Sequence, residues 1–186
     1  MKKLLLLFFI CFPACSENYS FIEGQLPNAS YDNEWIYLVP FEGASKKTVD
    51  STLIRKAGFR FKLKPEKQNQ IYILRVRPVL RLELQEILVV SEPGTVHVSL
   101  DLRSSASGTP LNETLQEWKE KKHSSDSILY SLRRKYREVS NETGKALLLS
   151  QIEELDKEYR TYSDSLAEMN KDNPVGQLIG SLFRDK

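Results

Sequence analysis

The stretch Ser107-Gly108-Thr109-Pro110-Leu111-Asn112 marks a change of pattern in this chain of 186 residues. Before it, apolar residues recur at every second position in short runs, as expected for half-buried β-strands. After it, apolar residues recur every three or four positions, as expected for amphipathic helices. Asn112 is a candidate N-cap of the first helix, because its side chain can accept a hydrogen bond from a free backbone N–H group. The sequence therefore predicts an α+β protein in which strands precede helices.

The part of the chain before this stretch contains seven or eight short runs of strand character. Turn-forming residues separate them, including Pro27-Asn28, Gly58 and Glu92-Pro93-Gly94. The candidate strands are residues 21–26, 35–39, 48–54, 59–63, 71–77, 80–84, 87–90 and 96–100. Strands of this number and spacing predict an antiparallel β-sandwich or barrel over residues 21–106.

Residues 107–170 have the periodicity of a helical hairpin. In its second half, apolar residues alternate at spacings of four and three, at Leu148, Ile152, Leu155, Tyr159, Tyr162, Leu166 and Met169. This heptad pattern predicts a helix that packs antiparallel along the preceding one. Asn141-Glu142-Thr143-Gly144 supplies the break between the two helices. The aromatic residues interpreted as packing rather than binding residues are Trp118, Tyr136, Tyr159 and Tyr162.

Residues 171–186 predict an amphipathic helical tail. Asn173 is placed to cap this helix, and Pro174 suits its first position, where no N–H donor is needed. An apolar stripe follows at Val175, Leu178, Ile179, Leu182 and Phe183. Because such a stripe needs cover, we expect the tail either to dock on the hairpin or to be covered by a further domain.

The N-terminus has the pattern of an exported bacterial lipoprotein. Lys2 and Lys3 precede an apolar run that is too short to cross a bilayer but suits a signal peptide over residues 1–14. Phe12-Pro13-Ala14-Cys15 resembles a lipobox, although Phe12 stands where leucine is usual. We expect lipidation of Cys15 to anchor the chain in the membrane, with residues 15–20 as a tether. The alternative is an ordinary signal peptide with a chance cysteine.

Composition and motifs argue against several classes of function. The net charge is close to balanced at +2, and acidic and basic residues interleave, which disfavours a nucleic-acid partner. Cys11 is lost with the signal peptide, so the mature chain keeps one cysteine and cannot form a dithiol site. His97 and His123 lie in segments of different type, and no set of zinc ligands is recognisable. We therefore expect no cofactor, no metal site and no catalytic residue.

Six short motifs occur in order along the chain. They are Phe21-Ile22-Glu23-Gly24, Ile36-Tyr37-Leu38, Val49-Asp50-Ser51, Gly58-Phe59-Arg60-Phe61, Glu92-Pro93-Gly94 and Gly108-Thr109-Pro110-Leu111-Asn112. Together they resemble the family called domain of unknown function 4369, found in envelope proteins of Bacteroidetes. The resemblance implies an exported, commonly lipid-anchored β-sandwich followed by helices. In many relatives this module precedes a thioredoxin-like or peroxiredoxin-like domain with Cys-x-x-Cys. The sequence has no such domain, so no catalytic residue carries over.

Three triplets resemble the acceptor for O-glycosylation in exported Bacteroidetes proteins, and their serines are Ser51, Ser127 and Ser165. Triplets of this kind also arise by chance, so these serines are candidate modification sites only. The basic strand faces formed by Arg60 with Lys62 and by Arg75 with Arg77 are interpreted as solvated surface rather than as sites for anionic ligands.

These patterns favour a non-enzymatic module of the cell envelope, in the outer membrane or periplasm. Its expected role is to hold or position an envelope partner or a thioredoxin-like domain. One alternative is a truncated or degenerate thiol-disulfide oxidoreductase whose redox domain is absent. Another is a glycan- or peptide-binding module that uses the sandwich face or the seam between the sandwich and the hairpin.

Overall fold

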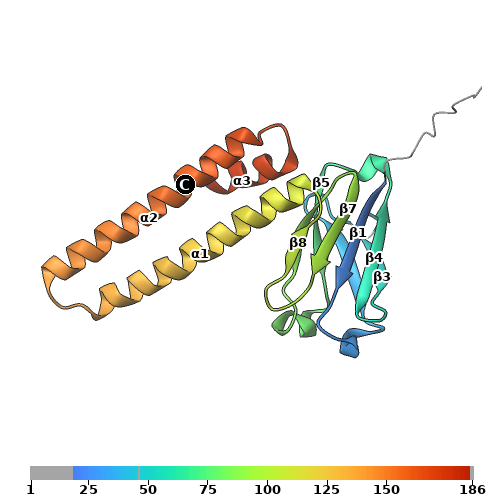
Figure 1. Ribbon diagram of the computed structural model, residues 1–186, viewed down its shortest axis with the longest axis horizontal. Coiled ribbons are helices and arrows are strands. Elements are labelled where there is room, and N and C mark those ends of the chain that lie inside the picture. The colour runs from blue at the N-terminus through green and yellow to red at the C-terminus, as the bar shows by residue number, and fades with distance from the viewer. Residues whose placement is uncertain (1–18, 46, 185–186) are drawn as a thin grey trace, which may run out of the picture.

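The computed structural model describes residues 19–45 and 47–184. In this part of the chain, two β-sheets form a sandwich, two long helices project from it as a hairpin, and a third helix folds back against the hairpin (Figure 1). The strands are β1 (Ser20–Gln25), β2 (Trp35–Pro40), β3 (Asp50–Leu53), β4 (Gly58–Leu63), β5 (Gln70–Arg75), β6 (Ile87–Ser91), β7 (Gly94–Ser99) and β8 (Ser105–Ser107). The α-helices are α1 (Pro110–Glu138), α2 (Glu142–Met169) and α3 (Pro174–Arg184), and the short 3-10 helices are η1 (Ala29–Tyr31), η2 (Pro65–Lys67) and η3 (Pro78–Leu82).

Each sheet of the sandwich contains four strands. One sheet has the order β4-β1-β7-β8 and the other the order β3-β2-β5-β6. Neighbouring strands are antiparallel except β1 and β7, which run parallel with Ser20 opposite Gly94. The predicted α+β class and the sandwich are confirmed, and the two sheets stay separate rather than closing into a barrel.

Alternation along the strands builds the core between the sheets. In β4, Phe59, Phe61 and Leu63 are buried, whereas Arg60 and Lys62 are exposed. This is the expected result of side chains that point to opposite faces of a strand in turn. Burying one such large apolar side chain stabilises the fold by about 1.5–3 kcal/mol.

Gly24 of β1 is required by the aromatic ring on the neighbouring strand. A Cβ atom at this position would lie 2.0 Å from the ring of Phe59, which is itself buried. The ring therefore occupies the space that a side chain of residue 24 would need. Glycine in a strand often marks such a close approach.

Residues 80–84 are not the strand that their alternation predicts. They overlap η3, which leaves Leu82 exposed and Leu84 buried. A proline begins η3, and its fixed φ and missing N–H suit the first turn of a helix. The eighth strand is instead β8, a three-residue edge strand that pairs with β7 and that the periodicity does not reveal. At the other end, β1 begins at Ser20, within the predicted tether.

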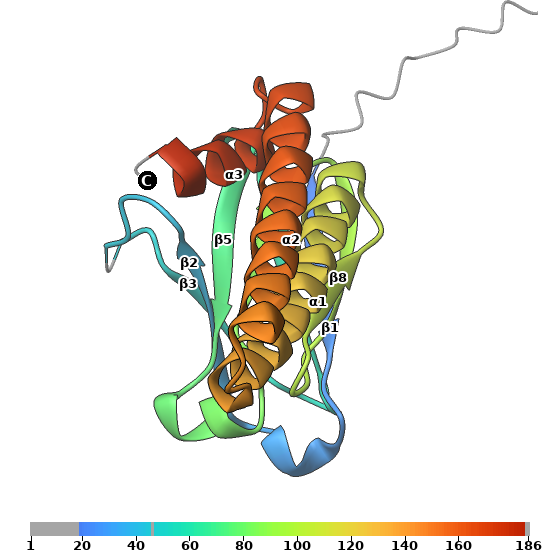
Figure 2. The same cartoon turned by 90° about the vertical axis from the view of Figure 1, so that its left-hand side faces the viewer.

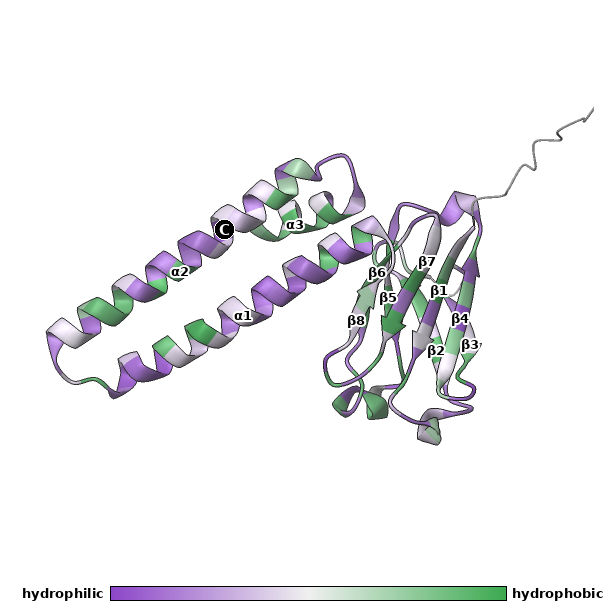
Figure 3. Ribbon diagram, viewed as in Figure 1, coloured by the Kyte–Doolittle hydropathy of each residue, from purple (hydrophilic) through white to green (hydrophobic). Residues whose placement is uncertain are grey.

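The two long helices form the predicted hairpin, and hydrophilic residues, purple in Figure 3, make up much of both helices. Asn141 caps α2, since its Oδ1 accepts a hydrogen bond from the Gly144 N–H at 2.6 Å. The packing role of Trp118 is confirmed: it is buried, and its Nε1–H donates to Ser163 Oγ at 3.2 Å. Met169 does not belong to the predicted seam, because it is the last residue of α2 and is exposed.

A second apolar core lies where the hairpin meets the sandwich. It joins β6 to all three α-helices through Val90, Leu115, Trp118, Tyr159, Leu166, Val175, Leu178 and Ile179. The predicted cap of the tail is confirmed, because Asn173 Oδ1 accepts hydrogen bonds from the N–H groups of Val175 and Gly176 at 3.0 and 3.2 Å. The tail therefore docks on the hairpin and crosses the start of β5 (Figure 2).

In the described part of the chain, none of the helices combines the length and apolar character needed to cross a membrane.

Candidate functional site

A buried polar cluster joins the sandwich to the start of α1. Its central residues are Glu92, in the turn between β6 and β7, and Asn112, in the first turn of α1. The Glu92 carboxylate accepts hydrogen bonds from the N–H groups of Leu111 and Asn112, at 2.9 and 3.2 Å. It thereby satisfies free donors at the helix start and lies at the positive end of the helix dipole.

Asn112 is not the N-cap that the sequence predicts, because Thr109 holds that position and Pro110 begins the helix. The side chain of Asn112 pairs instead with the backbone of Val90 in β6. Its Nδ2 donates to the Val90 carbonyl at 2.8 Å, and its Oδ1 accepts from the Val90 N–H at 2.9 Å. One amide side chain thus takes the place of a neighbouring strand at the edge of β6.

The same cluster also reaches the other sheet. Ser20, the first residue of β1, donates from its hydroxyl to the Glu92 carbonyl at 2.6 Å. We call Ser20, Val90, Glu92 and Asn112 the junction. Gly108 has a φ of +94° and passes so close to β7 that a Cβ atom there would lie 2.7 Å from the Thr95 carbonyl oxygen. The junction therefore fixes the direction of the hairpin relative to both sheets.

A polar cleft of about 490 Å³ lies between the turn that follows β7 and the outer side of α1. We call it the Lys119 cleft. The charged and titratable side chains that line it are Arg103, Lys119, Glu120, Lys122, His123 and Asp126. Lys122 forms an ion pair with Asp126 at 2.5 Å, whereas Arg103 and Lys119 form none with the residues described. The cleft therefore offers two cations to a ligand, beside the carboxylate of Glu120, which likewise forms no ion pair with the residues described.

Lys119 is the partly buried cation of this cleft. Its Nζ donates to Gln116 Oε1 at 3.0 Å, and Gln116 Nε2 donates in turn to Glu120 Oε1 at 2.8 Å. Burial lowers the pKa of Lys119 to about 8, because removing the ammonium from water outweighs the attraction of the Glu120 carboxylate. A bound anion would favour the charged form again, so this side chain is suited to an anionic group.

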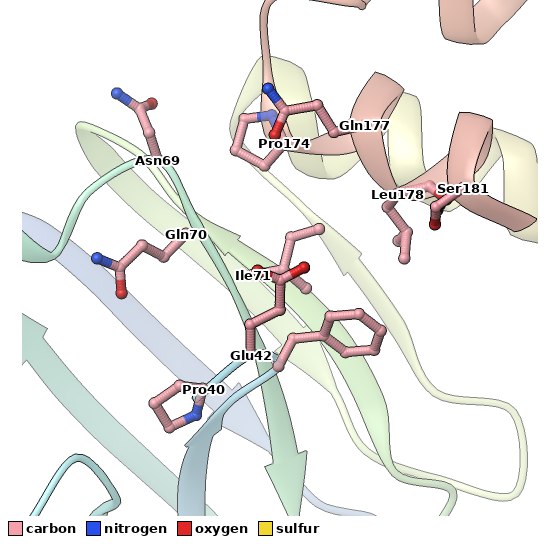
Figure 4. A pocket seen from close by; sticks show the side chains of 10 residues that line it. Pro40, Glu42, Asn69, Gln70, Ile71, Pro174, Gln177, Leu178 and Ser181 are labelled. Atoms are coloured by element: carbon pink, nitrogen blue, oxygen red, sulfur yellow. Dashed lines mark hydrogen bonds between the residues drawn. The ribbon is translucent and has the colours of Figure 1, made fainter. Parts of the chain in front are cut away.

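A second cleft, of about 430 Å³, lies between the sandwich and α3 (Figure 4). Residues 40–42 and 69–71 form its sandwich side, and Pro174, Gln177, Leu178 and Ser181 form its helical side. Apolar side chains such as Ile71 and Leu178 lie at its centre, with the amides of Asn69, Gln70 and Gln177 around them (Figure 4). Glu42 adds a carboxylate to this lining, so the cleft suits a ligand that has apolar and hydrogen-bonding parts and no negative charge.

The three candidate glycosylation serines lie on separate elements. Ser51 lies in β3, Ser127 in α1 and Ser165 in α2, and all three are exposed. Their modification remains a prediction. The signal peptide over residues 1–14, Cys15 and the tether as far as residue 18 lie outside the described residues.

The two histidines lie on different surfaces. His97 lies on β7 and is exposed, whereas His123 lines the Lys119 cleft. Among residues 19–45 and 47–184, no group of three or more His, Cys, Asp or Glu side chains is arranged to hold a metal ion.

The basic strand faces are paired with acids or aromatic rings. Arg60 pairs with Glu23 at 3.0 Å, and Arg75 pairs with Glu86 at 3.2 Å. The ammonium of Lys62 lies 3.6 Å from the centre of the Tyr19 ring, and Arg77 pairs with Glu34. This pairing agrees with the interpretation of a solvated sheet face.

Sequence patterns do not single out Glu92 or Lys119. Glu92 reads as part of a turn, and the helix that it caps begins only at Pro110. Lys119 is one of 27 lysine and arginine residues, and its burial depends on the turn after β7 lying against α1. The useful signal is that two of the family motifs noted in the sequence, Glu92-Pro93-Gly94 and Gly108-Thr109-Pro110-Leu111-Asn112, meet at the junction.

Among protein families, the model described as domain of unknown function (DUF4369) matches residues 21–115, just over half of the chain. The matched region contains the sandwich from residue 21 onward, three of the four junction residues and the start of α1, and it ends before most of the hairpin. Comparison with curated proteins and with solved structures gives no match.

Proposed function

This chain belongs to the family described as domain of unknown function (DUF4369), and on that premise we propose that it is a non-enzymatic lipoprotein module of the cell envelope that holds a partner protein in position. The partner that the family resemblance implies is a thioredoxin-like domain or another envelope protein. The observation that carries the proposal is the junction, which binds a long helical hairpin to both sheets through buried hydrogen bonds.

The length of the hairpin and the contacts at its base support a role in positioning a partner. α1 contains 29 residues, which corresponds to a length of about 43 Å at 1.5 Å per residue. Hydrogen bonds to a charged group such as the Glu92 carboxylate contribute about 1.5–3 kcal/mol each. An arm of this length that is held by such contacts presents its surface at a constant angle to the sandwich, which supports a role in placing a partner.

The lipid anchor is tested by labelling cells with an alkyne fatty acid. The wild-type chain is expected to incorporate the label, whereas a Cys15→Ser variant loses it, because the thiol is the attachment point. Gel fluorescence after coupling a dye to the alkyne measures the difference. A Cys11→Ser variant is the matched control, and it is expected to keep the label. Equal labelling of the Cys15→Ser variant and the wild type would contradict the anchor.

The positioning role is tested in the same cells with a photo-reactive amino acid. Placed at Tyr130 on the outer part of the hairpin, it is expected to crosslink to a second envelope protein, identified by mass spectrometry. Thr52 in β3 is the control position. Absence of any adduct with a second protein from Tyr130 and from other exposed hairpin positions would contradict the role.

The gene sequence that follows the codon of Lys186 distinguishes the truncated-oxidoreductase alternative from the positioning role. An in-frame continuation that encodes Cys-x-x-Cys would place this module inside an oxidoreductase. A neighbouring gene for a separate thioredoxin-like protein would instead support the positioning role, with that protein as the first partner to assay.

A second candidate function is favoured by the Lys119 cleft. We propose that this cleft binds a carboxylate, carried by a peptide or by an acidic glycan. The cleft lies at the seam between the sandwich and the hairpin, and Arg103 and Lys119 supply charge that no described acid neutralises by an ion pair. A carboxylate there could accept charge-assisted hydrogen bonds, which are stronger than neutral ones.

Lys119 is expected to be acylated first among the lysines by a limiting amount of an amine-reactive ester at pH 8. About half of its side chains are neutral at that pH, because the pKa is lowered to about 8. Mass spectrometry of peptides measures the rate at each lysine, with the exposed Lys122 of the same cleft as the comparison. Equal rates at Lys119 and Lys122 would contradict the expected environment of Lys119.

Ligand binding is expected to slow this acylation, because a bound carboxylate holds Lys119 in its charged form. N-acetylglutamate represents a peptide acid and glucuronate represents an acidic glycan, so the better protector identifies the source of the carboxylate. N-acetylglutaminamide, in which amides replace both carboxylates, is the neutral control. No protection by either acid would exclude the binding role while leaving the positioning role intact.

A further inference from the structure

An uncharged belt surrounds the outer part of the hairpin. Residues 127–132 of α1 and 146–152 of α2 contain no charged side chain. Four large side chains of this belt are open to solvent, with Ile128, Tyr130, Leu147 and Leu149 being 48, 66, 62 and 45% exposed. The belt appears as green segments on both helices near their connection (Figure 3). Exposed apolar surface of this kind often marks a contact with another macromolecule.

The ion pair between Lys121 and Glu158, at 2.9 Å, shows which residues of α1 and α2 lie level with each other. It also marks one side of the hairpin, which we call the flank. Ile128 lies seven residues, or about two turns, after Lys121. Leu147 lies eleven residues, or about three turns, before Glu158. Ile128 and Leu147 therefore share the flank of this ion pair, and the register places the two helical parts of the belt side by side. Tyr130 and Leu149 lie on other sides of their helices.

Charges of opposite sign lie on either side of the belt. Towards the tip, α1 carries the basic residues Arg133, Arg134, Lys135 and Arg137. Towards the sandwich, residues 153–158 of α2 contain four acidic residues, Glu153, Glu154, Asp156 and Glu158, and one basic residue, Lys157. Lys135 and Glu154 lie on the same flank as Ile128 and Leu147, since each is seven residues from one of them. Both are exposed, and neither forms an ion pair with the residues described.

We propose that this flank binds a second copy of the chain, with the two hairpins antiparallel about a two-fold axis through the belt. Such an axis places the Ile128 and Leu147 surface of one copy against the same surface of the other. Lys135 lies about five residues from the centre of the belt, on the side of the hairpin tip. Glu154 lies about five residues from the same centre, on the side of the sandwich. The two-fold axis therefore brings the basic zone around Lys135 of each copy to the level of the acidic zone around Glu154 of the other.

The flank is accessible for this contact. Asp126 lines the Lys119 cleft, where the sandwich meets α1. Because Asp126 is two residues before Ile128, it lies on the opposite side of the helix, about 200° around the axis. The sandwich therefore does not cover the Ile128 flank. Two hairpins that meet in this way form a four-helix arrangement, which buries apolar positions that a single two-helix hairpin leaves open.

Sedimentation velocity of the full chain in a mild detergent tests the proposal. The wild type is expected to be a dimer, and Leu147→Glu is expected to weaken the dimer at least tenfold, because it places a carboxylate in the centre of the contact. Leu149→Glu is the matched control: it makes the same change two residues away, on another side of α2, and is expected to leave the dimer intact. Circular dichroism checks that both variants keep their helix content.

Charge exchange gives the more specific test. Lys135→Glu and Glu154→Lys are each expected to weaken self-association, because each brings like charges together across the two-fold axis. An equimolar mixture of the two variants is expected to recover a heterodimer, since every basic zone then meets an acidic one. A monomeric wild type, equal effects of Leu147→Glu and Leu149→Glu, or failure of the mixture to associate would each overturn the proposal.

Discussion

The Asn112→Leu variant is expected to lose roughly 2–5 kcal/mol of unfolding free energy. The substitution leaves the N–H and the carbonyl of Val90 without their partner at a buried edge. An unsatisfied buried backbone group costs about 1–3 kcal/mol. Leucine has the same branching and the same number of side-chain heavy atoms as asparagine and is somewhat larger, so lost hydrogen bonding rather than an empty cavity accounts for most of the effect.

Urea denaturation followed by tryptophan fluorescence measures this loss, because Trp118 lies in the core next to the junction. Asn141→Ala is the matched control: it removes an exposed asparagine that caps α2, and a cap of this kind contributes only about 1 kcal/mol. A loss for Asn112→Leu no larger than that of the control would mean that the junction does not hold the hairpin.

The Gly176→Ala variant is expected to detach α3 from the hairpin. A Cβ atom at this position would lie 2.1 Å from the Asn170 carbonyl oxygen and 2.8 Å from that of Ala167, and both atoms belong to the backbone. Alanine favours a helix over glycine by about 1 kcal/mol. Exposure of the fully buried Val175 and Ile179 costs about 1.5–3 kcal/mol for each side chain, so the steric effect exceeds the gain in propensity.

Hydrogen exchange followed by mass spectrometry locates the effect of Gly176→Ala. The amides of α3 are expected to lose protection, while those of β1 and β7 keep it, because they belong to the separate core between the sheets. Gln177→Ala is the control, since this neighbouring side chain is exposed. Undiminished protection of α3 in Gly176→Ala would show that the backbone of α2 can move to accept a methyl group.

Much of the fold follows from local patterns in the sequence. Alternation in residues 59–63 identifies the buried face of β4, since a strand in a sandwich exposes one face to the core. Asn173-Pro174 identifies the start of α3 because both residues act on the adjacent turn. These predictions succeed where the deciding interactions lie within a few residues.

The errors arise where one local signal overrides another or where a distant segment decides the outcome. The alternation of Leu80, Leu82 and Leu84 resembles a strand, but the proline at the start of η3 and the position of the segment at the end of the sandwich favour a helical turn. Asn112 has the residue type of an N-cap, yet its partner is Val90, on a strand that ends well before the helix. A local pattern cannot reveal this partner.

The candidate site was less predictable than the fold. The seam between the sandwich and the hairpin was among the surfaces expected from the sequence, and both clefts involve the contact of the sandwich with helices. The residues that give the Lys119 cleft its character could not be selected in advance. The lowered pKa of Lys119 depends on burial by the turn after β7, which only the folded chain brings to α1.

The parallel pairing of β1 with β7 has a consequence for how the chain folds. The first strand needs a partner from near the end of the sandwich, with Ser20 opposite Gly94, before its sheet is complete. Contacts between such distant segments must overcome a large loop-closure entropy, and proteins that depend on them fold slowly. In a chain that emerges from its N-terminus, β4 can pair with one edge of β1, but the other edge stays unpaired until β7 emerges. That interval is when a chaperone would protect it most.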